Sequence, residues 1–304
     1  MNGRTYRIGG IVFNILFPPQ LQLKREVSFI DFEDKSTHGI DLICGLVEKD
    51  FVEDGYILYR ENTTVILKKD GRMFRYTGVL ETDRKVFWGS CTEIEKGEQK
   101  VFYVSFSKGR GICPTSKGRG ICPTKVISEK QVFSAVGFAY IMARSRRVIL
   151  HASLISYGNK GIAFTAPSGT GKSTQADLWR RWRSDVEIIN GDRAVLSCND
   201  GQAIAHGLPF CGSSGIARNI SVPLKAIIIL RKGKENRIKS PGATQAIKCL
   251  LSECAIDIWD REGTELVIEV MTDILRKVQV FIYECLPDRS AVDFLANFLQ
   301  KNGI

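Results

Sequence analysis

The stretch GIAFTAPSGTGKSTQADLW, residues 161–179, constrains the fold of this chain more than any other. A short apolar run ends, a loop with two glycines follows, and a helical pattern begins near Lys172. Residues 166–173 match the Walker A pattern, except that Ala166 replaces the leading glycine. A match of this length between a strand and a helix predicts a phosphate-binding loop.

Each position of this loop has a physical role. Gly169 and Gly171 permit the turn that aims successive backbone N–H groups at one cluster of oxygens. The helix that starts near Lys172 adds the positive end of its dipole. We expect Lys172 to reach the β- and γ-phosphates of a nucleotide and the Ser173 hydroxyl to join the shell of Mg²⁺. ATP and magnesium are therefore the expected cofactors, although no base contact in the sequence distinguishes ATP from GTP.

A carboxylate follows the next predicted strand, VEIIN at 186–190. Asp192 comes twenty residues after Lys172. A carboxylate at this place can bind Mg²⁺ directly or through water, or accept a proton from an attacking hydroxyl. The alternative is an aspartate that only forms a turn. The sequence leaves open whether Asp192 is the base, a metal ligand or both.

Residues 1–106 are predicted to form a small β-rich domain. Lys69-Asp70-Gly71 is typical of a hairpin turn. Because this half has no catalytic-looking cluster, we expect it to dock on the rest of the chain or to bind a partner. Its short β-branched and aromatic runs are TYRIGGIVFNI, EVSFIDF, GYILYR, TTVILKK, RMFRYTGVL, KVFWGSC and KVFYVSFS.

An exact tandem repeat follows, SKGRGICPT at 107–115 and again at 116–124. Its glycine, proline and basic residues predict a flexible linker over residues 107–127. Ser128 and Gln131 then fit a capping box, so a helix is expected to open the second domain, residues 128–304.

Strands and helices alternate in the second domain, which predicts an α/β fold with a mixed sheet. The expected strands are VILHASLIS, KGIAFTA, VEIIN, PLKAIIILRK and VQVFIYEC. The expected helices cover 172–183, 243–254 and 263–277, with one more after Pro287.

Composition excludes several classes of protein. Apolar residues make up 44% and charged residues 25%, which are ordinary globular values. No apolar run is long enough to span a membrane, and the opening residues lack a signal-peptide pattern, so we expect a cytoplasmic protein. Nine cysteines without a CxxC pair suggest neither a zinc site nor a disulfide scaffold. The net charge of +10 fits an acidic partner or nucleotide phosphates, and no nucleic-acid recognition motif accompanies it.

The order of motifs resembles a known family. A strand with LHAS, a short turn, a second strand and then SGTGKST resembles the HPr kinase/phosphorylase group and the related PEP carboxykinases. The patterns FTAPSGTGKST, INGDR and GSSG are similar to those of HPr-kinase-related kinases from bacterial peptide-tailoring clusters and their clostridial relatives. The resemblance covers residues 130–304 and implies a PEP-carboxykinase-like P-loop domain. Because HPr kinases assemble as hexamers, it also implies that this chain can self-associate.

The resemblance implies roles for the loop residues. Ser173 and Asp192 would hold Mg²⁺, and Lys172 and Asp192 would act on the transferred phosphoryl group. The nucleotide phosphates would be bound by Ser168, Gly169, Thr170, Gly171, Lys172, Ser173 and Thr174.

It also implies roles for residues outside the loop. His151 matches a histidine that HPr kinases keep near the reacting phosphate, with a core histidine as the alternative. Ser213, Ser214 and Arg218 match the segment that lines the active site. Arg218 or Arg193 would stabilise charge on the transferring phosphoryl group, with a surface arginine as the alternative for each.

Two positions depart from the family pattern. HPr kinases carry paired aspartates where this chain has Gly191-Asp192. The signature that resembles IRGLGI is absent, and HGLPFCGSSGIARN occupies its place. The second departure argues against HPr itself as the substrate.

Three functions remain open at this point. The preferred one is a serine kinase that phosphorylates Ser or Thr hydroxyls of a peptide or small protein. The others are a small-metabolite kinase and a nucleotide-sensing module with weak hydrolysis. The β-rich half is hypothesised to bind the leader segment of the acceptor by strand addition.

Overall fold

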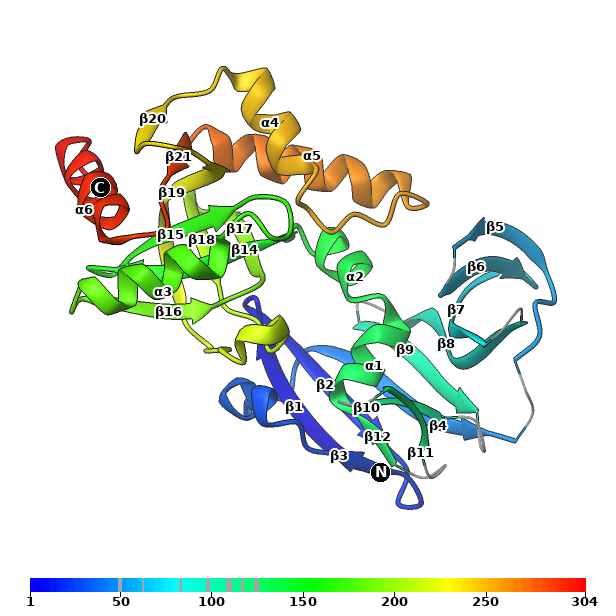
Figure 1. Cartoon of the computed structure of the whole chain (residues 1–304). Helices are drawn as coiled ribbons and strands as arrows, with labels where there is room; N and C mark the ends of the chain where they lie inside the picture. The colour runs from blue at the N-terminus through cyan, green and yellow to red at the C-terminus, as the bar shows by residue number, and fades with distance from the viewer. Residues whose placement is uncertain are drawn as a thin grey trace. The chain divides into compact units, whose positions relative to one another are not determined.

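The computed structural model describes residues 1–48, 51–61, 63–81, 84–96, 99–107, 111–115, 118–122 and 126–304. The chain is a mixed α/β protein of two compact units (Figure 1). The first unit comprises Met1–Arg7 and Ile11–Ile141, and the second comprises Ile8–Gly10 and Met142–Ile304. None of the described helices is both long and apolar enough to span a membrane.

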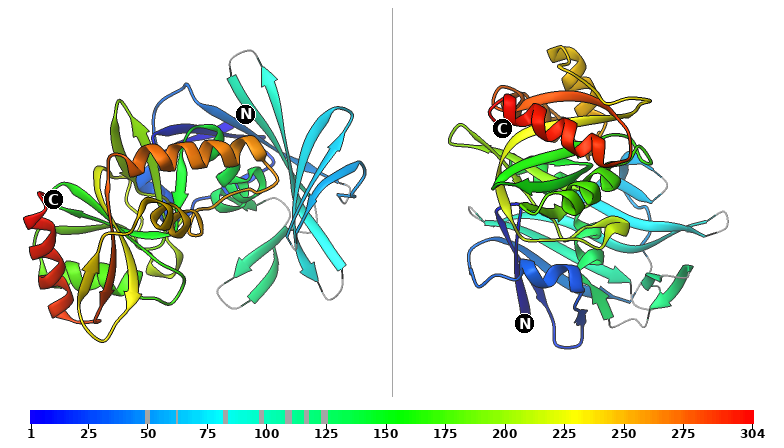
Figure 2. Two further views of the ribbon diagram at one scale, coloured as in Figure 1. Left: turned by 90° about the horizontal axis from the view of Figure 1, so that it is seen from above. Right: turned by 60° about the vertical axis from the view of Figure 1, so that its left-hand side comes forward.

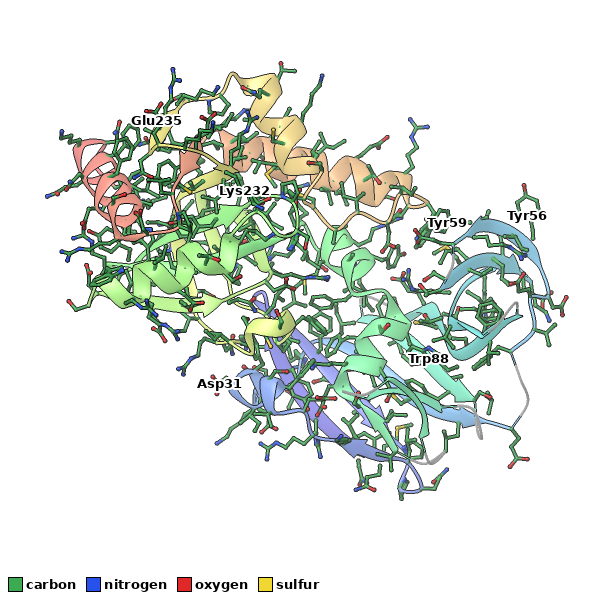
Figure 3. The ribbon with its side chains drawn as sticks, viewed as in Figure 1. Asp31, Tyr56, Tyr59, Trp88, Lys232 and Glu235 are labelled. Carbon is green, nitrogen blue, oxygen red and sulfur yellow. The ribbon has the colours of Figure 1, made fainter. Side chains whose placement is uncertain are left out.

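The first unit is built on an eight-stranded sheet in the order β1-β2-β4-β9-β8-β7-β6-β5. The turn between β6 and β7 has positive φ at Asp70 (48°) and Gly71 (77°), which confirms the predicted hairpin. Tyr56 and Tyr59 lie on the outermost strand, β5 (Figure 3). The strands are β1 (Asn2–Ile8), β2 (Ile11–Phe17), β4 (Ile40–Val47), β5 (Tyr56–Arg60), β6 (Thr64–Lys69), β7 (Arg72–Glu81), β8 (Arg84–Lys96) and β9 (Gln99–Ser107).

Two predicted segments of this unit form a different structure, and strand β4 and the short strands at 22–24 and 126–128 were not predicted. The run EVSFIDF, predicted as a strand, contains the 3₁₀ helix η1 (Val27–Phe32). Its three-residue period places Phe29 and Phe32 on one side, and both are buried. The tandem repeat, predicted as a loop, contributes β10 (Gly111–Thr115) and β11 (Gly118–Cys122), which pair with each other in an antiparallel hairpin.

The predicted capping box is confirmed at α1 (Glu129–Val136). Ser128 Oγ accepts from the backbone N–H of Gln131, and the Gln131 side chain accepts from the backbone N–H of Ser128. This helix contacts β7, β8, β9 and β12 (Val126–Ser128), which also pairs with β3 (Gln22–Lys24). The helix that we expected to open the second domain is therefore grouped with the first unit. Helix α2 (Phe138–Arg144) follows it.

The second unit contains a nine-stranded mixed sheet in which β15, β19 and β21 run parallel. The predicted helices of this half are present, and so are the predicted strands, except that VILHASLIS forms two strands that are separated at His151. Strands β17, β18 and β20 were not predicted. The strands are β13 (Val148–Leu150), β14 (Ala152–Tyr157), β15 (Lys160–Thr165), β16 (Val186–Asn190), β17 (Ala194–Asn199), β18 (Gln202–His206), β19 (Ser221–Lys232), β20 (Arg237–Lys239) and β21 (Gln279–Cys285). The helices are α3 (Lys172–Trp182), η2 (Gly212–Ser214), α4 (Ala243–Leu251), α5 (Arg261–Leu275) and α6 (Arg289–Lys301).

Helices cover both faces of this sheet (Figures 1 and 2). Successive side chains of a strand point to opposite faces, so β19 contributes to two cores. Ile227 and Ile229 pack in the cluster that contains α4 and α5, whereas Ile228 and Leu230 pack in the cluster that contains α3 and α6. Burial on both faces explains the continuous apolar run of this strand.

His206 lies buried between two serines of neighbouring strands. Its Nε2 is 3.0 Å from Oγ of Ser197 on β17, and its Nδ1 is 2.7 Å from Oγ of Ser221 on β19. Burial, with a smaller contribution from the charge of Arg147, lowers the pKa of His206 from 6.5 to about 4. The folded protein therefore keeps this imidazole neutral at pH values at which an unfolded chain protonates it.

We predict that His206 makes the free energy of unfolding fall as the pH drops from 6.5 to about 4. Within this window the unfolded chain binds a proton that the folded protein excludes, so the loss reaches up to about 3 kcal/mol at the lower limit. Denaturant unfolding of the wild type and of His206→Gln across this window measures the difference. Parallel stability profiles for the two proteins would contradict the prediction.

Candidate functional site

The glycine loop, residues 166–173, connects the carboxyl end of β15 to α3. A tight turn with positive φ at Gly158 (53°) and Asn159 (62°) joins β14 to β15, which leads directly into the loop. Gly169 and Gly171 have φ values of 75° and 116°, a region that side chains rarely adopt. A side chain added at either glycine would meet no atom within 4 Å, so the space over the loop is open.

Lys172 begins α3 with a buried side chain. Its Nζ donates to the backbone oxygens of Ala166 (2.7 Å) and Pro167 (3.4 Å). Burial lowers the pKa of Lys172, while the nearby carboxylates of Glu253 and Asp192 oppose part of this shift. The ammonium group thus lies under the loop and within the electrostatic reach of both carboxylates.

The other predicted phosphate ligands lie on the loop and on the first turn of α3. Ser168 and Gly169 are exposed, and Thr170 is partly buried. Ser173 and Thr174 are exposed next to the buried Lys172. The structure therefore presents these side chains to solvent at the amino terminus of α3, where backbone N–H groups favour anions.

Asn190 fixes the turn that carries Asp192. Its buried Oδ1 accepts from the backbone N–H groups of Asp192 and Arg193, each at 2.9 Å. Its Nδ2 donates to the oxygens of Leu208 (2.7 Å) and Phe210 (3.2 Å). One amide therefore joins the end of β16 to the segment that follows β18.

The segment after this connection packs against the turn. Gly212 lies so close to Asp192 that a side chain added there would approach the Asp192 carboxyl carbon to 2.8 Å. The space beside Gly191 is filled by Ser214, whose Oγ donates to the oxygen of Cys211 at 2.6 Å. A second aspartate next to Asp192 has no room in this structure.

Asp192 lies in a cluster with a histidine and a glutamate. Strand β14 runs antiparallel to β15 and β16, so its first residues lie where those strands end. His151 Nε2 is 3.6 Å from Oδ1 of Asp192, and His151 Nδ1 is 3.1 Å from Oε2 of Glu253. Glu253 was not predicted as a site residue, because it is 102 residues away from His151 and belongs to no motif.

The predicted arginines and serines lie at different distances from Asp192. Arg193 Nε is 3.4 Å from Oδ2 of Asp192. Arg218 is bonded through its backbone N–H to Ile189, but its side chain lies 4.0 Å from Glu187. The structure thus brings Arg193 to Asp192 and not the side chain of Arg218. Ser213 and Ser214 belong to η2, the short helix beside Gly191.

A cavity of about 390 Å³ adjoins the glycine loop. Thr165 and Thr170 line one part of it, and Ser252 and Glu253 line another. Lys232, at the carboxyl end of β19, also lines it (Figure 3). Glu253 therefore belongs to the cavity and to the cluster around His151.

Among the described residues, no group of three or more His, Cys, Asp or Glu side chains could hold a metal ion. Mg²⁺ usually keeps several waters and takes one or two carboxylates together with substrate phosphates. A single carboxylate with a serine hydroxyl, as at Asp192 and Ser173, is compatible with that pattern.

The fold and the site define a mixed α/β protein with a glycine loop at one end of a sheet. Residues 124–284 match the model of a family described as SynChlorMet cassette protein ScmC. Because this match covers more than half of the chain, the chain belongs to that family.

The structure of the HPr(Ser) kinase/phosphatase from Coxiella burnetii is 12% identical to this chain, with a TM-score of 0.29. The similarity covers 51% of this chain and 89% of that one. No curated protein matches the chain.

We predict that Asn190→Ala lowers the free energy of unfolding by about 3 kcal/mol, because several buried backbone groups lose their partner. Asn199→Ala, at the exposed end of β17, serves as the matched control and should change stability little. Denaturant unfolding of the two variants gives the comparison. Equal stabilities would show that the Asn190 bonds do not hold the turn.

We also predict that Gly191→Ala destabilises the protein by about 1–3 kcal/mol, since the new methyl group collides with Ser214. Replacing Ser214 by glycine in the same chain removes the collision. A double-mutant cycle should therefore show a coupling of at least about 0.5 kcal/mol in the compensating direction. Strictly additive effects would contradict the close packing of these two residues.

Proposed function

We propose that this protein is an ATP- and Mg²⁺-dependent kinase that phosphorylates a Ser or Thr hydroxyl of a peptide or small protein. The observation that carries the proposal is the convergence of the glycine loop, Lys172, His151 and Asp192. Phosphoryl transfer requires from a protein mainly positioning and stabilisation of charge. A buried cation, a carboxylate that can accept a proton and an open anion-binding loop are suited to these tasks.

The loop residues have defined parts in this proposal. Backbone N–H groups of residues 168–174 bind the phosphates, and Lys172 exchanges its loop carbonyls for phosphate oxygens. The Ser173 hydroxyl and the Asp192 carboxylate would hold Mg²⁺, which would neutralise charge on the transferred phosphoryl group. Mg²⁺-bound ATP supplies the phosphoryl group, and ADP leaves with the electron pair of the broken P–O bond.

The remaining residues act on the acceptor. Asp192 orients the acceptor hydroxyl and takes its proton as the new O–P bond forms. His151, 3.6 Å from Asp192, offers a second proton acceptor at the same place. Arg193 lies beside the Asp192 carboxylate, where its guanidinium offsets negative charge.

We extend the proposal to the type of kinase. The β14–β15 hairpin that leads directly into the glycine loop, and the acidic turn after β16, support a PEP-carboxykinase-like domain of the HPr kinase type over Met142–Ile304, rather than from residue 128 as the sequence predicted. The β-rich residues 1–106 would then hold the acceptor peptide. The same proposal places the protein in the cytoplasm and includes its self-association.

A second candidate is a kinase for a small metabolite. The cavity beside the glycine loop, about 390 Å³, has the size of small-molecule sites, which are commonly 300–1,000 Å³. Its lining includes Arg231 and Lys232, which suit an anionic metabolite. The acceptor assay below distinguishes this candidate from the protein kinase.

We predict that Lys172→Ala lowers the affinity for Mg²⁺–ATP about tenfold or more, because a charge-assisted contact to phosphate is lost. Asp192→Asn should keep nucleotide binding and lose at least about 100-fold in phosphoryl transfer. The matched controls are Lys225→Ala on β19 and Asp200→Asn in the β17–β18 turn, since both residues are exposed. Calorimetry with ATP gives the affinities.

Transfer is measured with γ-labelled ATP and a soluble bacterial extract that is afterwards separated into proteins and small molecules. Label that enters a protein or peptide and disappears with Asp192→Asn supports the proposal. Label in the small-molecule fraction supports the metabolite kinase. ATP binding without transfer to any acceptor would instead favour a nucleotide sensor.

A further inference from the structure

Glu253 is fixed next to His151 by the backbone. The segment after α4 runs along β13, where the His151 N–H donates to the oxygen of Glu253 and the Ala255 N–H donates to the oxygen of Ile149, both at 2.9 Å. Thr165 Oγ1 donates to the backbone oxygen of His151 at 2.9 Å. Both backbone polar groups of His151 are therefore bonded, which fixes the part of the backbone that carries the imidazole.

The side chains of Glu253 and His151 also contact each other. The Glu253 carboxylate is 11% exposed and lies 3.1 Å from Nδ1 of His151, within hydrogen-bond distance. Asp192 Oδ1, at 3.6 Å from Nε2, is beyond that distance. A neutral histidine has one N–H group. Because only Glu253 is within hydrogen-bond distance, the geometry favours a hydrogen on Nδ1, which donates to Glu253.

Packing leaves no space for a second carboxylate at Gly191, next to Asp192. Ser214 fills the space next to Gly191, so the turn itself can carry only one acidic side chain. Glu253 reaches the same site from a different element, and its charge acts on Lys172 together with that of Asp192. The site thus has two carboxylates, and they face opposite sides of one imidazole.

Building on the proposed kinase function, we propose that Glu253 is a positioning residue that holds the His151 proton on Nδ1 and leaves the Nε2 lone pair facing Asp192. Because these two acceptors are 3.6 Å apart, a hydroxyl oxygen that lies about 3 Å from each of them can direct its hydrogen at both. The pair formed by Nε2 and Oδ1 is therefore the place where the acceptor hydroxyl binds. Without Glu253, the ring proton would move to Nε2, and this N–H group would donate to Asp192. Neither Nε2 nor Oδ1 of Asp192 would then be free to accept from the hydroxyl group.

The test is a substitution at Glu253 that removes the carboxylate and keeps a side chain of similar length. Glu253→Met retains the backbone bond to His151, because that bond uses the main-chain oxygen. Glu253→Gln keeps one acceptor oxygen for Nδ1–H. Glu235→Met, at an exposed glutamate between β19 and β20, is the matched control (Figure 3).

The first readout is the tautomer of His151, which does not depend on activity. The chain has three histidines, so ¹⁵N-histidine labelling gives a simple spectrum, and a His151→Asn variant assigns the ring. We expect protonated Nδ1 in the wild type and protonated Nε2 in Glu253→Met, with His206 unchanged in both. A wild-type ring protonated on Nε2, or the same tautomer in both proteins, overturns the proposal.

The second readout is kinetic. We expect Glu253→Met to lower kcat about 100-fold while the KM for ATP changes by less than about twofold. Glu253→Gln should recover at least about tenfold of that loss, because its oxygen still accepts from Nδ1. Equal losses in kcat for Gln and Met, or a loss confined to KM, would contradict a positioning role. If the wild type transfers no phosphoryl group, the kinase proposal fails and the tautomer measurement still decides the role of Glu253.

Discussion

The buried amide of Asn190 is the interaction on which the geometry of the site depends. Its oxygen holds the backbone of the turn after β16, and its nitrogen holds the segment that leads to η2. Ser153 adds a bond to the oxygen of Gly191 at 2.7 Å. With both segments held, Gly212 lies against Asp192 and Ser214 lies against Gly191. The direction in which Asp192 projects follows from these contacts.

Much of the fold of residues 128–304 could be predicted from local patterns. The turn at Gly158-Asn159, the apolar run of β19 and the capping box at Ser128 each follow from a few neighbouring residues. The secondary structure was predicted less well in segments where tertiary packing, and not local sequence, selects the conformation. The segment around Phe29 has the composition of a strand, but burial of residues three apart selects a 3₁₀ helix.

The candidate site was predictable only in part, for a related reason. The glycine loop and Asp192 belong to continuous motifs, and His151 could be proposed from its place before the loop. Glu253 reaches the site through the pairing of the α4–α5 connection with β13, which depends on contacts between residues about a hundred positions apart. Likewise, the absence of a second aspartate at Gly191 could be read from the sequence, but its cause, the packing of Ser214, required the structure.

The pairing of residues 253–255 with β13 has a consequence for the integrity of the sheet. Strand β13 is the last strand on its side of the sheet order, and the bridge between Leu150 and Cys254 covers its outer backbone groups. Uncovered strand borders recruit other chains and lead to aggregation. The connection that forms one wall of the cavity therefore also shields the sheet, so this wall cannot swing away freely without creating an adhesive surface. A ligand that enters the cavity without displacing this connection leaves the outer border of β13 covered.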